Sequence, residues 1–272
     1  MKRIGYSVLT VLAFATIAGS ANLASATPTP NGAVITTRVF NDCPGSSITT
    51  NNAYPGVIGI ADGGSGCGGF ANRHAWSFSA DGGATPIAFV NGDKFSYCAT
   101  LNISGSGAEG GLRLSPWWSP DVDGNFNCRT TDGEVACFGG RLPFYSFTGT
   151  YGLRYLPGTP ITLMIDYDPH QVSFLDPATI VYTVTYGANT YTSGPLAFDH
   201  ANPAEDPPHG VWGILSPARV GGHLQIFLPK DANGDPTFGP FGVEATWSNI
   251  CFDAGPTPAN NTTWGKIKAN YR

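Results

Sequence analysis

One segment restricts the fold of this chain more than any other, the stretch Gly124–Phe147 with the sequence GNFNCRTTDGEVACFGGRLPFYSF. Two runs of strand-forming residues flank Asp132-Gly133, and Asp-Gly between alternating runs is the strongest local signal for a two-residue β-hairpin. A two-residue loop there pairs Cys128 with Cys137 at a site without hydrogen bonds, where Cα atoms lie about 4.5 Å apart. That spacing permits a disulfide, so the hairpin predicts a Cys128–Cys137 bridge.

The first residues predict export. Lys2 and Arg3 give a positive start, Tyr6–Ile17 an apolar centre, and Ala24-Ser25-Ala26 a small-residue cleavage site. This order is typical of a signal peptide, here residues 1–26. No later run approaches the roughly 18 apolar residues that a spanning helix needs. We therefore expect a secreted or cell-surface protein without a transmembrane segment.

All six cysteines follow the signal peptide, and an even number in an exported chain predicts three disulfides. With Cys128–Cys137 as one of them, three arrangements of the other four remain. We favour Cys43–Cys67, which closes a glycine-rich loop, and Cys98–Cys251, which ties an early strand to the last one. The alternative for Cys128 and Cys137 is two thiols that merely face each other. No pair has the CxxC spacing of a zinc site.

The rest of the chain predicts β-structure. Its 36 glycines and 22 prolines are spread along the sequence, and both residues are poor helix formers. Between them lie short alternating stretches, such as Pro160–Tyr167, which places Ile161, Leu163 and Ile165 on one face. About eleven to thirteen strands separated by turn signals favour an all-β antiparallel sandwich, a single domain over residues 27–253. The net charge of -5 disfavours nucleic acid and anionic membranes as partners.

Several segments carry specific expectations. Thr179–Tyr186 and Asn189–Ser193 are predicted to form a hairpin around Gly187-Ala188, and Gly210–Leu215 is predicted to pair with His223–Leu228. Asp42–Gly69 is expected to be a long surface excursion with at most a short strand at residues 57–60. Residues 254–261 are interpreted as a linker and 262–272 as a tail, which is either a disordered terminus or a sorting tag.

Six segments follow one another in an order that resembles that of a known group of proteins; they are HAWSFSADGGAT, EGGLRLSP, DGEVACFGGRLPFYSF, YLPGTPITLMIDY, YTSGPLAFD and ARVGGHLQIF. From His74 to Phe252 the chain resembles a group of exported bacterial proteins, many of which end in a sorting tag of the PEP-CTERM type. These look like concanavalin A-like sandwiches of the lectin, glucanase and laminin G kind, or jelly rolls. The resemblance implies two curved antiparallel sheets, with the concave face or its rim loops as the glycan site. This chain lacks the PEP-CTERM tag, so shared anchoring is not implied.

Two sets of catalytic candidates follow. Glucanases of this fold place E-x-D-x-x-E on one strand, and the sequence has no such triplet, so hydrolysis by paired carboxylates is disfavoured. Glu109 with Arg113 would either line a groove or form a surface salt link. Lyases of this kind of fold use a His or Tyr base with Arg and Gln or Asn. His223 and Gln225 share one face of their strand, and further candidates are Arg113, Arg141 and Tyr145; the alternative is an exposed polar sheet face.

Trp117-Trp118 is the best binding signal, since neighbours on a strand point to opposite faces and one indole would be left to stack on a sugar. Alternatively, Pro116 and Pro120 bend the segment and both rings are buried. With Arg113 and Arg141 these tryptophans form the predicted ligand site. The other candidate core tryptophans are Trp76, Trp212 and Trp247.

The turn around Asp121, Asp123 and Asn125 offers oxygen ligands for calcium, but it lacks the terminal glutamate of a complete twelve-residue loop, and turn chemistry alone explains these residues. Taken together, the sequence predicts a non-catalytic, lectin-like domain that binds a glycan or another cell-surface component. The alternatives are a polysaccharide-degrading enzyme, a lyase before a hydrolase, and a structural surface or matrix protein.

Overall fold

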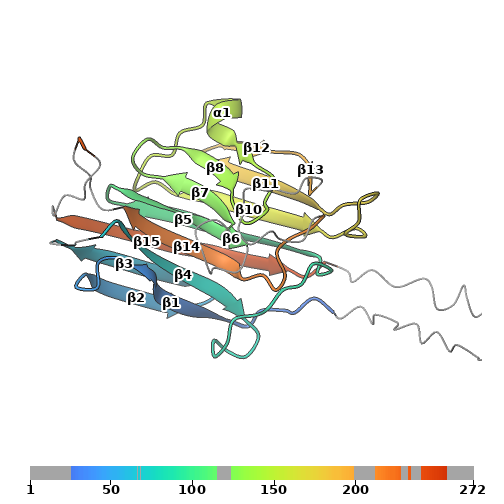
Figure 1. The fold of residues 1–272 in the computed structure, drawn as a ribbon, viewed down its shortest axis with the longest axis horizontal. Helices are drawn as coiled ribbons and strands as arrows, with labels where there is room; N and C mark the ends of the chain where they lie inside the picture. The colour runs from blue at the N-terminus through green and yellow to red at the C-terminus, as the bar shows by residue number, and fades with distance from the viewer. Residues whose placement is uncertain are drawn as a thin grey trace, which may run out of the picture.

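In a computed structural model, the chain forms two antiparallel β-sheets packed face to face (Figure 1). The structure describes residues 26–65, 67, 69–114, 124–198, 212–227, 232–233 and 240–255. The predicted signal peptide, except Ala26, and the predicted tail lie outside these residues. The all-β antiparallel sandwich that the strand pattern predicted is confirmed.

We call the two layers the inner and the outer sheet. The inner sheet has the order β1-β4-β14-β6-β7-β8-β9, and the outer sheet has the order β12-β11-β10-β5-β15-β3-β2, with β13 added beside β11. The inner strands are β1 (Gly32–Asn41), β4 (Ala71–Ser79), β6 (Ala108–Leu114), β7 (Asn125–Arg129), β8 (Val135–Phe138), β9 (Tyr145–Ser146) and β14 (Val220–Phe227). The outer strands are β2 (Ser47–Ala53), β3 (Val57–Gly64), β5 (Phe95–Ser104), β10 (Ile161–Asp168), β11 (Thr179–Tyr186), β12 (Asn189–Thr192), β13 (Leu196–Ala197) and β15 (Phe241–Asp253).

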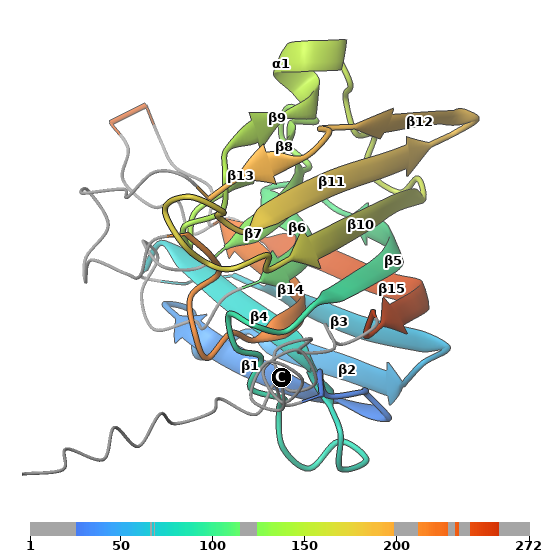
Figure 2. The same ribbon diagram turned by 90° about the vertical axis from the view of Figure 1, so that its right-hand side faces the viewer.

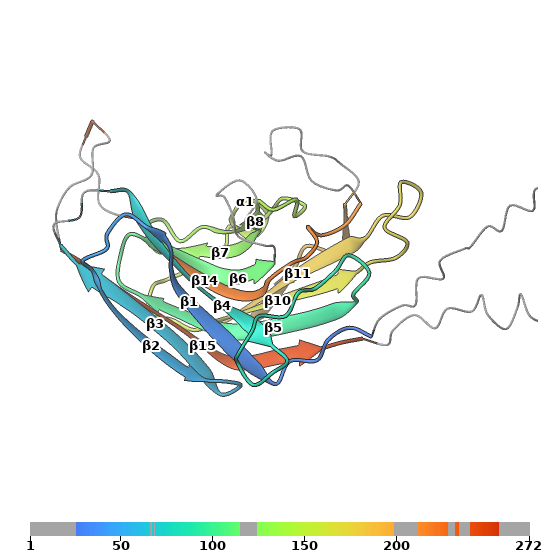
Figure 3. The ribbon, with the colours of Figure 1, turned by 60° about the horizontal axis from the view of Figure 1, so that its bottom comes forward.

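Both sheets curve in the same sense, and the inner sheet lies on the hollow side of the curve (Figure 3). Its face that points away from the outer sheet is therefore concave. The single helical turn α1 (Phe147–Tyr151) lies at the end of the sandwich where β9 and β12 meet the surface (Figure 2). None of the helices in the described ranges is long and apolar enough to span a bilayer.

The core between the sheets is rich in aromatic side chains. Trp76 of the inner sheet and Trp247 of the outer sheet meet edge to face, with ring centroids 6.2 Å apart, and both are fully buried. Gly222 of β14 makes this contact fit, because a Cβ there would lie 2.3 Å from Nε1 of Trp76 and 2.8 Å from Nε1 of Trp247. These two tryptophans are confirmed as core residues. Trp212 is only half-buried and packs against Phe174, so its prediction was wrong.

The hairpin around Asp132-Gly133 exists, but its register differs from the prediction by two residues. Cys128 pairs with Val135, and Cys137 pairs with Phe126. The chain turns through a longer loop, in which the Arg129 N–H donates to the Glu134 carbonyl and the Gly133 N–H donates to the Arg129 carbonyl. The predicted Cys128–Cys137 disulfide was therefore wrong, and both residues are buried free thiols.

The other two predicted disulfides are present. Cys43–Cys67 and Cys98–Cys251 have Cα atoms 4.9 and 5.0 Å apart. The second joins β5 to β15 in the middle of the outer sheet, as the prediction of a link between an early and the last strand required.

Two segment predictions need correction. Residues 42–69 are not a surface excursion, since β2 and β3 pair there and form the edge of the outer sheet. Gly210–Leu215 does not supply a partner for β14, because β14 lies between β4 and β6 and residues 212–215 contain no strand. The hairpin of β11 and β12 around Gly187-Ala188 is confirmed.

Candidate functional site

Polar side chains gather on the concave face of the inner sheet, in three rows that follow the strand register. One row holds Arg73, Gln225, Glu109 and Arg129, the next holds Ala75, His223, Gly111 and Asn127, and the third holds Ser77, Gly221, Arg113 and Asn125. Their strand neighbours, such as Leu224 and Leu112, point into the core. Residues directly opposite each other on antiparallel strands share a face, so β4, β14, β6 and β7 bring these groups together.

These side chains are far less exposed than those of an ordinary solvated sheet face. Arg73, Glu109, Arg113, Asn127 and His223 are between 0 and 7 % exposed. Buried polar groups are stable only when hydrogen bonds compensate for lost hydration. The concave face is therefore a buried polar network, and the alternative of an exposed polar face does not hold for it.

Arg73 connects two strands of this network. Its guanidinium donates to the side-chain oxygen of Gln225 at 2.7 Å and to that of Asn125 at 2.9 Å. Burial lowers the pKa of Arg73 to about 9, and repulsion from Arg113 acts in the same direction. Arg73 still carries its charge at neutral pH, which makes this face a place where an anion is favoured.

Glu109, Asn127 and His223 form a second chain of contacts. Asn127 Nδ2 donates to Glu109 Oε2 at 2.8 Å, which turns Asn127 Oδ1 toward His223 Nε2 at 3.2 Å. Because a carbonyl oxygen only accepts, Nε2 of His223 carries the proton. Nδ1 is then a bare lone pair, and it has no hydrogen-bond partner among the residues described.

The surroundings keep His223 neutral. Burial lowers the pKa of His223 far below its ordinary value, and the charges of Arg73 and Arg113 lower it further, partly opposed by the Leu112 main chain. Burial also raises the pKa of Glu109, partly opposed by the hydrogen bond from Asn127 and the charge of Arg73. An unprotonated imidazole is the form that can accept a proton.

A small hollow of about 120 Å³ opens at one end of the concave face. Arg113, Arg219, Ser77 and Thr36 supply its polar lining. The two guanidinium groups repel each other: burial lowers the pKa of Arg113 to about 10, and Arg219 lowers it as well. Arg219 Nη1 donates to the carbonyls of Pro86 and Ile87, which holds this guanidinium at the hollow, and guanidinium groups match carboxylates in shape.

The structure brings some of the predicted site residues together and separates others. Glu109, Arg113, His223 and Gln225 share the concave face. Tyr145 does not, because it is opposite Cys137 on the core-facing side and packs against Phe147. Arg141 is buried in the segment that joins β8 to β9.

Of the other predicted site residues, only Asn125 is among those that the structure describes. The others lie outside the described residues; they are Trp117, Trp118, Asp121 and Asp123. The side-chain oxygen of Asn125 accepts from a cationic guanidinium, which does not suit the predicted calcium ligand. No cluster of three or more His, Cys, Asp or Glu side chains suited to a metal ion occurs within the ranges that the structure describes.

Three site residues were missed from the sequence. Arg73 directly precedes the predicted strand, and its alternation with Ala75 and Ser77 would have placed it on the polar face. Asn127 was assigned to the hairpin alone. Arg219 has no signal in the sequence, since it enters the hollow from just before β14.

No protein-family model matches the chain, and no curated protein matches it. Solved structures with a similar chain path do exist. The lectin UEA-II in complex with galactose has 9% identity and a TM-score of 0.41, covering 84% of this chain and 96% of that chain. An alginate lyase of polysaccharide lyase family 7 has 9% identity and a TM-score of 0.40, covering 82% and 94%. A β-1,3-glucanase from Mycobacterium marinum has 9% identity and a TM-score of 0.39, covering 83% and 93%. Similarity at this level carries no argument about chemistry, so the function of this chain rests on its own residues.

Proposed function

We propose that this protein is an exported glycan-binding domain that binds an acidic polysaccharide at the hollow at one end of the concave face. The observation that carries the proposal is the hollow lined by Arg113 and Arg219, where two guanidinium groups lie beside the hydroxyls of Ser77 and Thr36. A uronate unit offers a planar carboxylate for the first pair and ring hydroxyls for the second. Two disulfides support an oxidising, extracellular setting.

Binding of polyuronate oligosaccharides, measured by calorimetry, tests this function. A hydrogen bond to a charged group contributes about 1.5–3 kcal/mol, so Arg219→Gln should weaken binding about tenfold or more. Arg219→Lys keeps the charge and should lose less. Arg154→Gln is the matched control, because Arg154 is an exposed arginine that donates to the Asp132 carbonyl, away from the hollow. Equal affinity of the Arg219→Gln and Arg154→Gln variants would contradict the proposal.

A second candidate function is β-elimination in the same polysaccharide. It is favoured by one observation, the neutral His223 near the charges of Arg73 and Arg113, whose Nδ1 has no hydrogen-bond partner among the described residues. It requires that this fully buried ring become accessible to the substrate. Such a base could remove the proton next to a carboxylate whose developing charge the arginines stabilise; the glycosidic C–O bond at the neighbouring carbon then breaks as the double bond forms, and the leaving oxygen takes a proton from water. Formation of an unsaturated, ultraviolet-absorbing product that His223→Gln abolishes, with binding retained, would establish the lyase. Binding of the polysaccharide without formation of any product would favour the non-catalytic glycan-binding domain over the lyase.

A further inference from the structure

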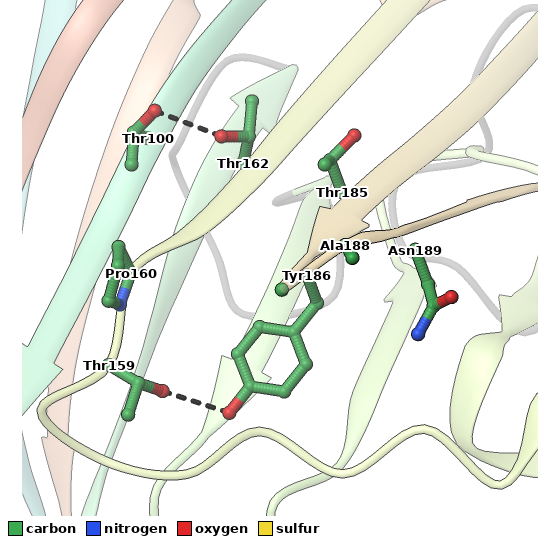
Figure 4. A pocket seen from close by; sticks show the side chains of 9 residues that line it. Thr100, Thr159, Pro160, Thr162, Thr185, Tyr186, Ala188 and Asn189 are labelled. Atoms are coloured by element: carbon green, nitrogen blue, oxygen red, sulfur yellow. Dashed lines mark hydrogen bonds between the residues drawn. The ribbon is translucent and has the colours of Figure 1, made fainter.

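A second, larger hollow lies on the opposite side of the sandwich, on the face of the outer sheet that points away from the core. Its volume is about 600 Å³, within the range of about 300–1,000 Å³ of small-ligand pockets. It opens over β5, β10 and β11 and the turn that follows β11 (Figure 4). Its polar lining consists of Thr100, Thr159, Thr162, Thr185, Tyr186 and Asn189, and the rest is proline, glycine and alanine. None of these residues is charged at neutral pH.

The floor of this hollow continues a row of threonines in strand register. Thr100, Thr162, Thr185 and Thr190 are successive partners across β5, β10, β11 and β12. The hydroxyls of Thr100 and Thr162 are 2.9 Å apart (Figure 4), and those of Thr185 and Thr190 are 3.0 Å apart. Each hydroxyl has one donor and two acceptor lone pairs, so each bonded pair keeps a donor for a ligand. The row thus offers polar groups and methyl groups at the strand spacing of about 4.8 Å.

Tyr186 lies at the end of β11, at the margin of the hollow, with its ring turned toward the core side of the sheet and its hydroxyl fixed by hydrogen bonds. Thr159 donates its hydroxyl proton to the Leu156 carbonyl, so its oxygen accepts from the Tyr186 hydroxyl at 2.9 Å (Figure 4). The Leu156 N–H donates to the same Tyr186 oxygen at 3.1 Å. These contacts hold the aromatic ring in place before any ligand arrives, which reduces the entropy lost on binding.

We propose that this hollow is a binding site for a neutral oligosaccharide. The hydroxyls of a sugar match the donors and acceptors of the threonine row, and the apolar side of its ring packs against Pro160 and the threonine methyl groups. An acidic sugar is disfavoured here, because its carboxylate would lose hydration without a cation among the lining residues. The two outward faces of the sandwich thus select ligands of different charge.

The test uses the full chain and neutral oligosaccharides of glucose, mannose, galactose and xylose, screened by saturation-transfer NMR and measured by calorimetry. The double variant Thr162→Val/Thr185→Val keeps the shape and methyl groups and removes two hydroxyls. We expect it to bind the preferred oligosaccharide at least tenfold more weakly. Thr183→Val is the matched control, since Thr183 is on β11 two residues before Thr185 and outside the hollow. Thr185→Val alone, at an exposed position, serves if the double variant does not fold.

The outcomes separate this proposal from the one for the concave face. Loss of neutral-sugar binding in Arg219→Gln, with normal binding in the threonine variants, would overturn it. So would the absence of binding by every neutral oligosaccharide in the panel. A concentration-dependent dimer that the threonine variants abolish would assign the hollow to a second copy of the chain, which also contradicts the proposal.

Discussion

Asp62 of the outer sheet and His74 of the inner sheet meet across the sandwich, with Oδ2 2.9 Å from Nε2, and neither side chain is exposed. The Arg38 N–H donates to His74 Nδ1 at 2.9 Å, so the imidazole proton is on Nε2 and is donated to Asp62. Asn72 donates to the same carboxylate oxygen at 2.8 Å. This hydrogen-bonded cluster joins the two sheets through polar contacts, whereas the rest of their contact is mainly apolar.

The first prediction concerns acid stability. Burial raises the pKa of Asp62, but hydrogen bonds from His74, Asn72 and Ser46 outweigh it and hold the pKa below its ordinary value. A lowered pKa in the folded state stabilises the protein above the unfolded value of about 3.9, and this contribution is lost as pH falls through the folded value. Asp62→Asn should therefore cost about 1–3 kcal/mol at neutral pH and progressively less below about pH 4.

Denaturant unfolding at several pH values measures this effect. Glu244→Gln, at an exposed position of β15, is the matched control. A difference between wild type and Asp62→Asn that stays constant from neutral to acid pH would contradict the pKa argument.

The second prediction concerns the two free thiols. Burial raises the pKa of both Cys128 and Cys137, so almost no reactive thiolate forms at neutral pH. A chromogenic thiol reagent should find no reactive cysteine in the native protein and two after denaturation without reductant. Cys128→Ala should give one. If the denatured wild-type chain had no titratable thiols, Cys128 and Cys137 would be joined by a disulfide, which would contradict this prediction.

The third prediction concerns Gly222, which leaves room for the contact between Trp76 and Trp247. A methyl group there overpacks the core, so Gly222→Ala should cost about 1–3 kcal/mol. Gly242→Ala is the control, because nothing lies within 4 Å of a Cβ built at that position. Denaturant unfolding and near-ultraviolet circular dichroism of the tryptophans report the difference. Equal stability of the two variants would contradict the tight fit.

The fourth prediction concerns salt. Binding of a polyuronate at the hollow should weaken as ionic strength rises, because salt screens the attraction between the polyanion and the half-buried Arg219 over about 10 Å at 0.1 M. Arg219→Gln should reduce this dependence. The neutral oligosaccharides proposed for the outer hollow should bind with little change over the same salt range. Salt-insensitive binding of the polyuronate would count against the arginine pair.

The sequence predicted which side chains share a face of a strand better than it predicted which residues pair across neighbouring strands. The register of the β7–β8 hairpin differs from the expectation by two residues, and an even shift leaves every side chain on its predicted face. Cys128 and Cys137 therefore share one face, as expected, while the disulfide between them was wrong. The two-residue turn failed because Asp132 binds the guanidinium of Arg129 and accepts from the Glu134 N–H, and because the Tyr155 N–H donates to the Gly133 carbonyl. The last of these contacts comes from a distant segment, which a local pattern does not contain.

The same limit applies to the candidate site. Alternation placed His223 and Gln225 on one face, but only the order of β4, β14, β6 and β7 brings Arg73 and Asn127 beside them. Tyr145 was close to the site in sequence and is on the other side of the sheet in the fold. Strand order depends on the whole chain, and no stretch of residues specifies it alone.

The strand closest to the end of the described chain occupies the centre of the outer sheet. β15 lies between β3 and β5 and is bridged to β5 through Cys98–Cys251. Without β15 the outer sheet is divided into two ribbons, and the edges of β3 and β5 have unpaired backbone N–H and C=O groups. Such edges can pair with strands of other chains. Molecules cut short upstream of Phe241 should therefore aggregate, because both ribbons would keep these unpaired edges.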